Sequence, residues 1–246
     1  MAHEEIIRIQ PQTDTAVVFI HGILGTPDHF SPLVPLVPPE WSVVNLLLPG
    51  HGGSVKDFSA SSMDAWRACV DRTVENLLKT HEKVLIAAHS MGTLFALEQA
   101  GKHPDRVKRL FLLGVPLRIR VRRQMFVNAL SLYFNRECPD DEILLATKNA
   151  CSITRDKRIW RYLGWIPRYL ELFYRIYRTR KTLEAVSTPG IVFQSRMDEM
   201  ISLKACRNLS EAKGLQVNIL DNSMHYYYAP EDWEAILDSF SEFLKE

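Results

Sequence analysis

Short runs of apolar residues recur along the chain, with stretches of mixed polarity between them. Five of these runs lack strict alternation and a sixth alternates more clearly; they lie at 15–20, 42–48, 83–88, 107–113, 190–195 and 215–220. Apolar runs without strict alternation are typical of parallel strands that are covered on both faces. The pattern therefore predicts the strands of a mostly parallel sheet.

The stretches between these runs carry apolar residues three or four positions apart, as on the buried face of a helix. Ser62 is a typical N-cap residue, and the helical series that follows it is Trp66, Val70, Val74, Leu77 and Leu78. Two further series are Leu94, Leu97 and Ala100, and Trp233, Ile236, Leu237, Phe240 and Leu244. Strands that alternate with helices predict an α/β fold in which helices flank the sheet through right-handed crossovers.

The segment 117–185 interrupts this alternation. It contains no clear strand, and its three helical stretches lie at 123–134, 140–150 and 165–185. It holds 15 Lys/Arg against 7 Asp/Glu, whereas the rest of the chain holds 15 against 22. We therefore predict a basic helical insertion at the carboxyl edge of the sheet, within one domain whose core is formed by 1–116 and 186–246.

Length, charge and cysteine content narrow the class of protein. A chain of 246 residues fits one α/β domain, and a net charge of +1 provides no global field that favours nucleic acid. The four cysteines are scattered without C-x-x-C spacing, which favours reduced thiols over a metal site or disulfides. The first residues, MAHEEIIRIQ, do not resemble a secretory signal, and no run reaches the length of a membrane span. These features predict a cytoplasmic enzyme or binding protein.

Ser90 lies between a predicted strand and a predicted helix, in the stretch LIAAHSMGT. A nucleophilic serine in this context is usually flanked by G-x-S-x-G, and here the small residues two positions away are Ala88 and Gly92. Alanine adds only one methyl group, so the close approach of helix and strand is retained. The simpler alternative is a serine that caps the helix.

A glycine-containing loop, HGILG at 21–25, follows the first strong strand. Such a loop can direct a backbone N–H at a reacting carbonyl group, and we expect the oxyanion donors to be the amides of Ile23 and Met91. The alternative is an ordinary turn at the end of a strand. A second glycine loop, LPGHGGS at 48–54, is interpreted as a structural turn because it matches no phosphate-binding pattern.

An acid and a base follow Ser90 in the order Ser, Asp/Glu, His. Asp198 comes directly after the run 190–195, with Glu199 as the neighbour that could substitute for it. His225 comes after the last predicted strand, whereas Asp221 is better explained as a turn residue. The seven other histidines are weaker candidates for the base: His89 should point away from the serine, His21 and His51 lack an orienting acid, and His3, His29, His81 and His103 look like surface or loop residues.

Five motifs, HGILGTP, LPGHGGS, AHSMGT, MDEMI and NSMH, give the chain a resemblance to the α/β-hydrolase superfamily over its whole length. More narrowly, it resembles small bacterial carboxylesterases and monoacylglycerol lipases. This resemblance implies a nucleophile at Ser90, an acid at Asp198 and a base at His225, with oxyanion amides from Ile23 and Met91. It also implies that the helical insertion is a lid over the acyl pocket, and that the protein needs no cofactor or metal.

The expected reaction is hydrolysis of a small-molecule carboxylic ester with a short to medium acyl chain, for which monoacylglycerols are one candidate. A thioesterase or acyltransferase of the same fold is the first alternative, and a non-catalytic ligand-binding protein is the second. The sequence leaves the acyl length, the alcohol group and the oligomeric state open.

The aromatic and basic part of the insertion has two interpretations. Five apolar residues, Tyr169, Leu172, Phe173, Ile176 and Tyr177, lie at helical spacing with Arg168, Arg175 and Arg178 among them. They could face an acyl chain while the arginines meet anionic lipid. For membrane contact we favour the simpler interpretation, in which the apolar residues pack on the core and the arginines are solvated.

Overall fold

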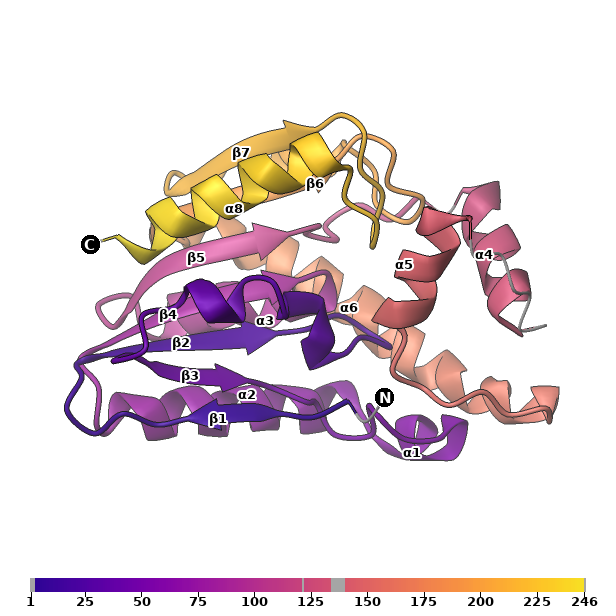
Figure 1. The fold of residues 1–246 in the computed structure, drawn as a ribbon, viewed down its shortest axis with the longest axis horizontal. Coiled ribbons are helices and arrows are strands. Elements are labelled where there is room, and N and C mark those ends of the chain that lie inside the picture. The colour runs from indigo at the N-terminus through magenta and orange to yellow at the C-terminus, as the bar shows by residue number, and fades with distance from the viewer. Residues whose placement is uncertain (1–2, 121, 134–139, 246) are drawn as a thin grey trace.

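A computed structural model describes residues 3–120, 122–133 and 140–245. Its centre is a seven-stranded sheet (Figure 1). The strand order is β1 (Ile6–Arg8), β3 (Ser42–Asn45), β2 (Thr15–Ile20), β4 (Lys83–His89), β5 (Val107–Leu113), β6 (Gly190–Ser195) and β7 (Leu215–Leu220). Only the β1–β3 pair is antiparallel. The predicted α/β class and mostly parallel sheet are confirmed.

Two details of the predicted strands were wrong. The run 42–48 forms a strand only as far as Asn45. The Leu46 N–H still donates to the Phe19 carbonyl of β2 at 3.1 Å, but the Leu48 N–H donates to His21 Nε2 at 3.1 Å instead of to a strand. The edge strand β1 was not predicted, since it is only three residues long and mostly exposed. An apolar run thus shows burial, but it does not show where the hydrogen-bonded ladder stops.

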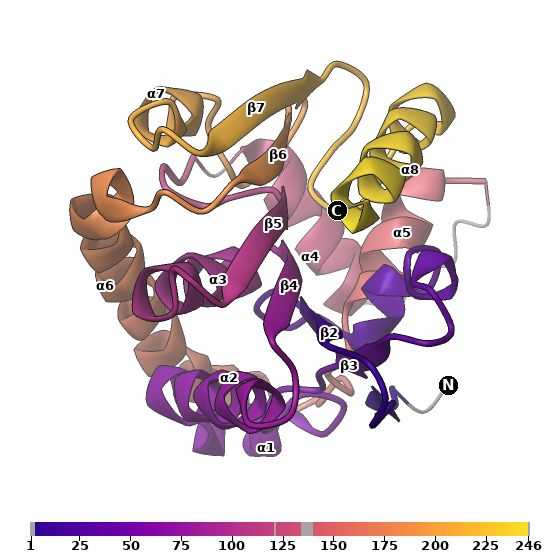
Figure 2. The same cartoon turned by 90° about the vertical axis from the view of Figure 1, so that its left-hand side faces the viewer.

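Helices cover both faces of the sheet (Figure 2). One face packs against α2 (Met63–Leu78) and α3 (Met91–Lys102), on which α6 (Ile166–Thr182) packs in turn, and the other packs against α8 (Pro230–Leu244). The predicted N-cap Ser62 accepts the Ala65 N–H. The two faces hold separate apolar clusters, so the sheet is buried on both sides. This agrees with the prediction from strands in which apolar and polar residues do not alternate.

Two short helices were not predicted. The first, α1 (Val55–Ala60), begins with a capping box in which the side chains of Ser54 and Asp57 bond each other's backbone N–H. The second, α7 (Ala205–Leu209), has five residues and no side-chain cap. Both are too short to present a helical repeat of apolar residues.

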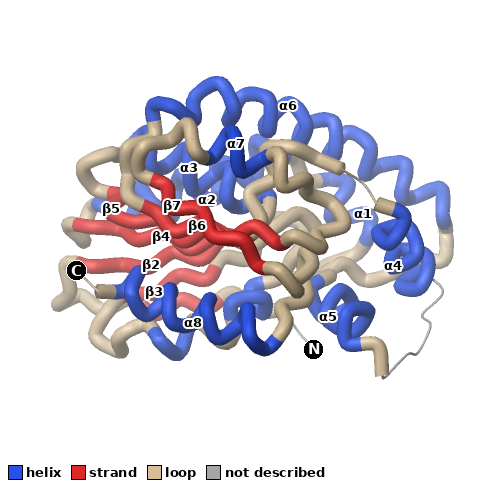
Figure 3. Tube along the Cα trace, turned by 90° about the horizontal axis from the view of Figure 1, so that it is seen from above, coloured by secondary structure: helices blue, strands red, loops and turns tan. Residues whose placement is uncertain are grey.

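The described residues of the segment 117–185 form helices joined by loops, with isolated bridges at Ile119 and Thr154 and no strand. Its main helices are α4 (Arg123–Tyr133), α5 (Glu142–Ala150) and α6, and residue 134, the predicted end of the first, lies outside the described residues. Figure 3 shows α4 and α5 beyond the strand ends and α6 alongside the sheet. The prediction that the whole segment lies at the carboxyl edge was therefore wrong for α6.

The position of α6 follows from two of its apolar residues. Leu172 and Ile176 are buried in the same cluster as the inner sides of α2 and α3. Arg175, which we expected to be solvated, lies beside Glu98 of α3 and stacks on the ring of Phe95. An ion pair and an apolar stripe together fix α6 against α3.

Within the described residues, no helix combines the length and the hydropathy that crossing a membrane requires.

Candidate active site

Ser90 stands at a sharp turn between β4 and α3. Its φ of 50° and ψ of −122° lie outside the regions that non-glycine residues prefer, so the turn is strained. The Ser90 N–H donates to the Leu113 carbonyl of β5 at 2.9 Å, which ties the turn to the sheet. This is the geometry of a nucleophile elbow, in which the strained residue projects its hydroxyl from the sheet edge.

The elbow also requires helix and strand to approach closely, and Gly92 permits this. A Cβ atom at Gly92 would lie 2.1 Å from the carbonyl oxygen of Ile20, so no other residue fits without a shift of the backbone. On the strand side, Ala88 is fully buried and pairs with Ile20 and Leu112. A small residue is therefore needed at both positions, but only position 92 requires glycine.

This packing gives a prediction for Ala88. Ala88→Gly should keep kcat/KM within a few-fold of wild type, whereas Ala88→Val should destabilise the fold by about 1–3 kcal/mol through overpacking. Urea unfolding and ester hydrolysis of the two variants measure the difference. Equal stability of both variants would show that the space around Ala88 is not tightly filled.

The side chains of Ser90, His225 and Asp198 form one hydrogen-bonded series. His225 Nε2 lies 3.0 Å from Ser90 Oγ, and His225 Nδ1 lies 2.8 Å from Asp198 Oδ2. The other carboxylate oxygen of Asp198 accepts the Met200 and Ile201 N–H groups, both at 2.7 Å. All three side chains are buried. The arrangement can move a proton from the hydroxyl to the imidazole while the carboxylate holds the ring in place.

Glu199 and Asp221, the other acids weighed from the sequence, lie elsewhere. Glu199 is buried, but its Oε2 accepts the backbone N–H of His225 at 3.2 Å rather than an imidazole N–H. Asp221 is exposed and pairs with Arg196. The structure thus places Asp198 on the imidazole and Glu199 on the main chain of the same histidine, so both carboxylates face His225.

Nearby carboxylates give His225 a pKa shift opposite to that of four other buried or half-buried histidines. Burial lowers the pKa of His21 to about 4 and that of His29 to about 3, and it also lowers the pKa of His51 and His89. Burial acts on His225 in the same direction, but the charge and hydrogen bond of Asp198 and the charge of Glu199 outweigh it and raise its pKa.

This raised pKa predicts the acid side of the pH–activity profile. The imidazole must be neutral to accept a proton, so kcat/KM should fall as the pH drops through the pKa of His225. The midpoint should lie above the ordinary histidine value of 6.5. A kcat/KM profile between about pH 5 and 9 measures it. Glu199→Gln should move the midpoint downward, because it removes a negative charge near the ring; an upward movement would contradict this assignment.

Three other histidines make contacts that the sequence did not reveal, although His89 follows the prediction that it avoids the serine. His89 points away from the serine hydroxyl, and its Nε2 lies 3.1 Å from the carbonyl oxygen of His225, where it supports the loop. His29 packs its ring 4.0 Å from that of His89. His81, expected at the surface, is buried and bonds Ser42 Oγ at 2.8 Å. Single histidines outside a motif carry no sequence signal that separates these cases.

The loop 21–25 makes a tight turn in front of the elbow. Gly22 is required because a Cβ there would lie 2.9 Å from the Cβ of Ser90, and Leu24 has a positive φ of 59°. The Leu24 carbonyl accepts the N–H of Ser152 at 2.9 Å and its hydroxyl at 3.3 Å. Among the described residues, the amides of Ile23 and Met91 have no protein acceptor. The sequence did not reveal Ser152, since it lies in the insertion.

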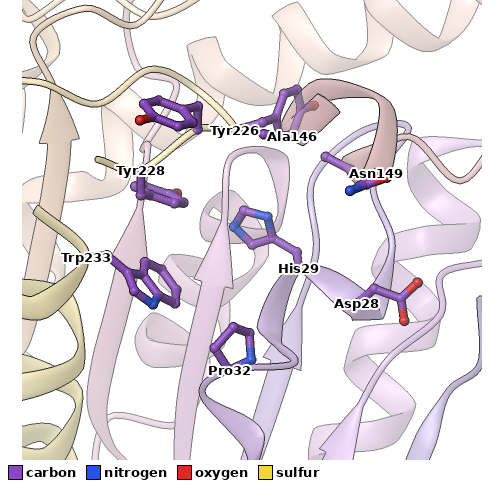
Figure 4. A pocket seen from close by; sticks show the side chains of 10 residues that line it. Asp28, His29, Pro32, Ala146, Asn149, Tyr226, Tyr228 and Trp233 are labelled. Carbon is purple, nitrogen blue, oxygen red and sulfur yellow. The ribbon is translucent and has the colours of Figure 1, made fainter. Parts of the chain in front are cut away.

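A pocket of about 360 Å³ lies behind the loop that carries His225 (Figure 4). It accounts for the run HYYY, because Tyr226, Tyr227 and Tyr228 all line it. The opposite wall comes from His29 and from α5. Ser90, Asp198 and His225 do not line this pocket, so the tyrosine run lies beside the hydrogen-bonded series rather than within it.

In the part of the chain that the structure describes, no group of three His, Cys, Asp or Glu side chains is arranged to hold a metal ion.

Two curated proteins align with less than half of the chain. A pimeloyl-[acyl-carrier protein] methyl ester esterase from Aromatoleum aromaticum is 32% identical over 98 residues, 40% of this chain and 36% of that protein. The dihydrolipoyllysine-residue acetyltransferase component of the acetoin cleaving system from Pseudomonas putida is 34% identical over 102 residues, 41% of this chain and 26% of that protein. The chain thus spans about a third of the length of the first relative and about a quarter of the length of the second.

Solved structures align with almost the whole chain. One, from a report on two metagenome-derived lipolytic enzymes, has a TM-score of 0.76 at 20% identity and covers 99% of this chain and 97% of its own. The monoacylglycerol lipase of Paleococcus ferrophilus has a TM-score of 0.68 at 20% identity, with 98% and 97% covered. At these identities the likeness establishes the fold. Residues 15–142, slightly more than half of the chain, match the model of the alpha/beta hydrolase fold family, and the chain belongs to that family.

Proposed function

We propose that this protein is a serine hydrolase that cleaves carboxylic esters of short to medium acyl chains through an acyl-enzyme on Ser90. The observation that carries the proposal is the unbroken hydrogen-bonded series from Asp198 through His225 to Ser90, with distances of 2.8 and 3.0 Å. A serine hydroxyl is a weak nucleophile, and this arrangement supplies the base that activates it.

In the proposed first step, His225 Nε2 takes the proton of Ser90 Oγ as that oxygen attacks the ester carbonyl. The negative charge on the carbonyl oxygen is accepted by the N–H groups of Ile23 and Met91. The tetrahedral intermediate then collapses, the bond to the alcohol oxygen breaks, and the alcohol leaves with the proton from His225. A water molecule, deprotonated by His225, then attacks the acyl-enzyme. The second tetrahedral intermediate collapses, Ser90 takes its proton back from His225, and the carboxylic acid is released.

The insertion 117–185 completes the site in this proposal, with α4 and α5 as the lid. These two helices lie beyond the carboxyl ends of the strands, where the serine is projected (Figures 1 and 3). The bonds from Ser152 to the Leu24 carbonyl join the end of α5 to the oxyanion loop. Closure of this cover would exclude water from the oxyanion and strengthen its hydrogen bonds.

The same residues suit a thioesterase or an acyltransferase, since all three reactions pass through an acyl-enzyme. The two curated relatives differ in this way, because one is named for a methyl ester and the other for acetyl transfer. An ester substrate is favoured here because five of the six curated relatives that align with part of the chain are named as methyl ester esterases. A non-catalytic binding protein would not need a base and an orienting acid beside the serine.

Fluorophosphonate labelling followed by peptide mass analysis tests the proposal. The probe should modify Ser90 in the folded protein and fail after unfolding in urea. A series of p-nitrophenyl esters should show turnover that depends on acyl length, and added methanol should divert part of the product to the methyl ester. Label on another serine, or no turnover across esters and thioesters, would contradict the proposal; thioester turnover alone would favour the thioesterase.

A further inference from the structure

The outer side of the insertion carries a row of exposed apolar side chains, which we call the outer face. Its eight large residues are between 46% and 65% exposed: Ile159, Trp160, Leu163, Ile166, Leu170, Phe173, Tyr174 and Tyr177. From Leu163 onward they recur at helical spacing, so they share one side of the short helical turn Ile159–Trp165 and of α6. Contiguous exposed rows of this size mark surfaces that contact a membrane or another protein.

The fold does not need the outer face for its own packing. Helix α6 already buries its opposite side, through Leu172 and Ile176, against the core that includes α3. In Figure 2, α6 lies at the periphery of the molecule, outside α2 and α3. A helix that is apolar on both sides, with only one side covered within the described residues, leaves its second side available to a partner.

The charge of the segment that carries the outer face narrows the choice of partner. Residues 155–185 contain nine Lys/Arg and three Asp/Glu, and one of the arginines, Arg175, is paired with Glu98 of α3. Two of these acids are paired within the segment, Asp156 with Arg158 and Arg161, and Glu171 with Arg168. A second copy of the chain would bring the same excess of positive charge against itself, which opposes a symmetric dimer. The complementary surface is therefore apolar in its interior and negatively charged at its boundary.

The geometry points to a bilayer that contains anionic lipid as the partner of the outer face. In this arrangement α6 lies parallel to the membrane surface, with Leu163, Leu170 and Phe173 among the upper acyl carbons. The rings of Trp160, Tyr174 and Tyr177 lie at headgroup depth. Lys181, whose Nζ is 4.5 Å from the centroid of the Tyr177 ring, meets the phosphates. Docking requires no turnover, so it goes beyond the proposed function.

The location of the outer face links docking to the candidate active site. The turn Ile159–Trp165 packs against α1, beyond the carboxyl ends of the strands (Figure 1). This is the same end of the molecule at which Ser90 is projected. A docked molecule therefore holds its candidate active site close to the lipid surface, where apolar esters are concentrated.

Vesicle sedimentation of the full-length protein tests the inference. Vesicles of phosphatidylcholine and phosphatidylglycerol in equal parts should bind at least about tenfold more tightly than phosphatidylcholine alone, and about 500 mM NaCl should weaken this binding several-fold. The variant Leu163→Glu/Leu170→Glu should bind at least about tenfold more weakly, because it places two carboxylates in the apolar row. Arg178→Glu/Lys181→Glu should lose the preference for the anionic lipid.

The matched control is Ile7→Glu, which makes the same kind of change at a side chain that is 62% exposed on the edge strand β1. Its binding should stay within about twofold of wild type, and all variants should keep Tm within about 2 °C because only exposed side chains change. Absent binding to the anionic vesicles, or equal losses in Ile7→Glu and the double variant, would overturn the inference. A dimer in light scattering that Leu163→Glu/Leu170→Glu dissociates would overturn it too, by assigning the outer face to a second copy.

Discussion

Ser90→Ala is expected to lower kcat/KM for ester hydrolysis by about 10⁶-fold, the cost that is typical of removing the nucleophile from a catalytic triad. His225 then has no hydroxyl from which to take a proton, and the remaining rate comes from the oxyanion amides acting on water. The fold should persist, because alanine is strained to the same extent as serine at a φ of 50°. Hydrolysis of p-nitrophenyl butyrate and circular dichroism measure the two effects.

The control for this variant is Ser241→Ala, which removes an exposed hydroxyl on α8 that donates to the Leu237 carbonyl at 3.0 Å. It should leave both kcat and fluorophosphonate labelling unchanged. If Ser90→Ala retains hydrolysis within about tenfold of wild type, the nucleophile lies elsewhere and the proposed function fails.

Asp198→Asn is expected to lower kcat by about 10⁴-fold while the fold remains intact. The amide oxygen can still accept the N–H groups of Met200 and Ile201, which hold the present carboxylate at 2.7 Å. The new NH₂ group, however, faces His225 Nδ1 and forces the imidazole proton onto Nε2. That nitrogen then points a proton at Ser90 and cannot accept one.

Glu199→Gln is the matched control, since it makes the same change one residue away. In the wild-type protein the backbone N–H of His225 donates to Glu199 Oε2 at 3.2 Å, and the amide oxygen of the glutamine can still accept it. The kcat of Glu199→Gln should therefore fall by less than about tenfold. A larger loss in Glu199→Gln than in Asp198→Asn would reverse the assignment of the two acids. Stopped assays at several pH values separate a change of kcat from the shift of the acid midpoint that both variants should show.

Local patterns were sufficient for much of the fold. The strands appear as apolar runs because both faces of the sheet are covered, and α2 was predicted from Ser62 and the apolar series that begins at Trp66. The elbow was predictable because Gly92 and Ala88 meet a steric demand within five residues of sequence. The position of α6 was not, since an apolar stripe shows that a helix is buried without showing against what.

The sequence by itself determined the kinds of residue available for chemistry and their order: a serine after a central strand, an acid after a later strand, and a histidine after the last one. Parallel strands end at the same edge of the sheet, so this order already placed the three near one another. Only the tertiary structure decided that Asp198 rather than Glu199 meets the imidazole, that Ser152 bonds the loop 21–25, and that α6 exposes a second apolar side. These outcomes depend on contacts between segments far apart in sequence, and local periodicity carries no information about which segments meet.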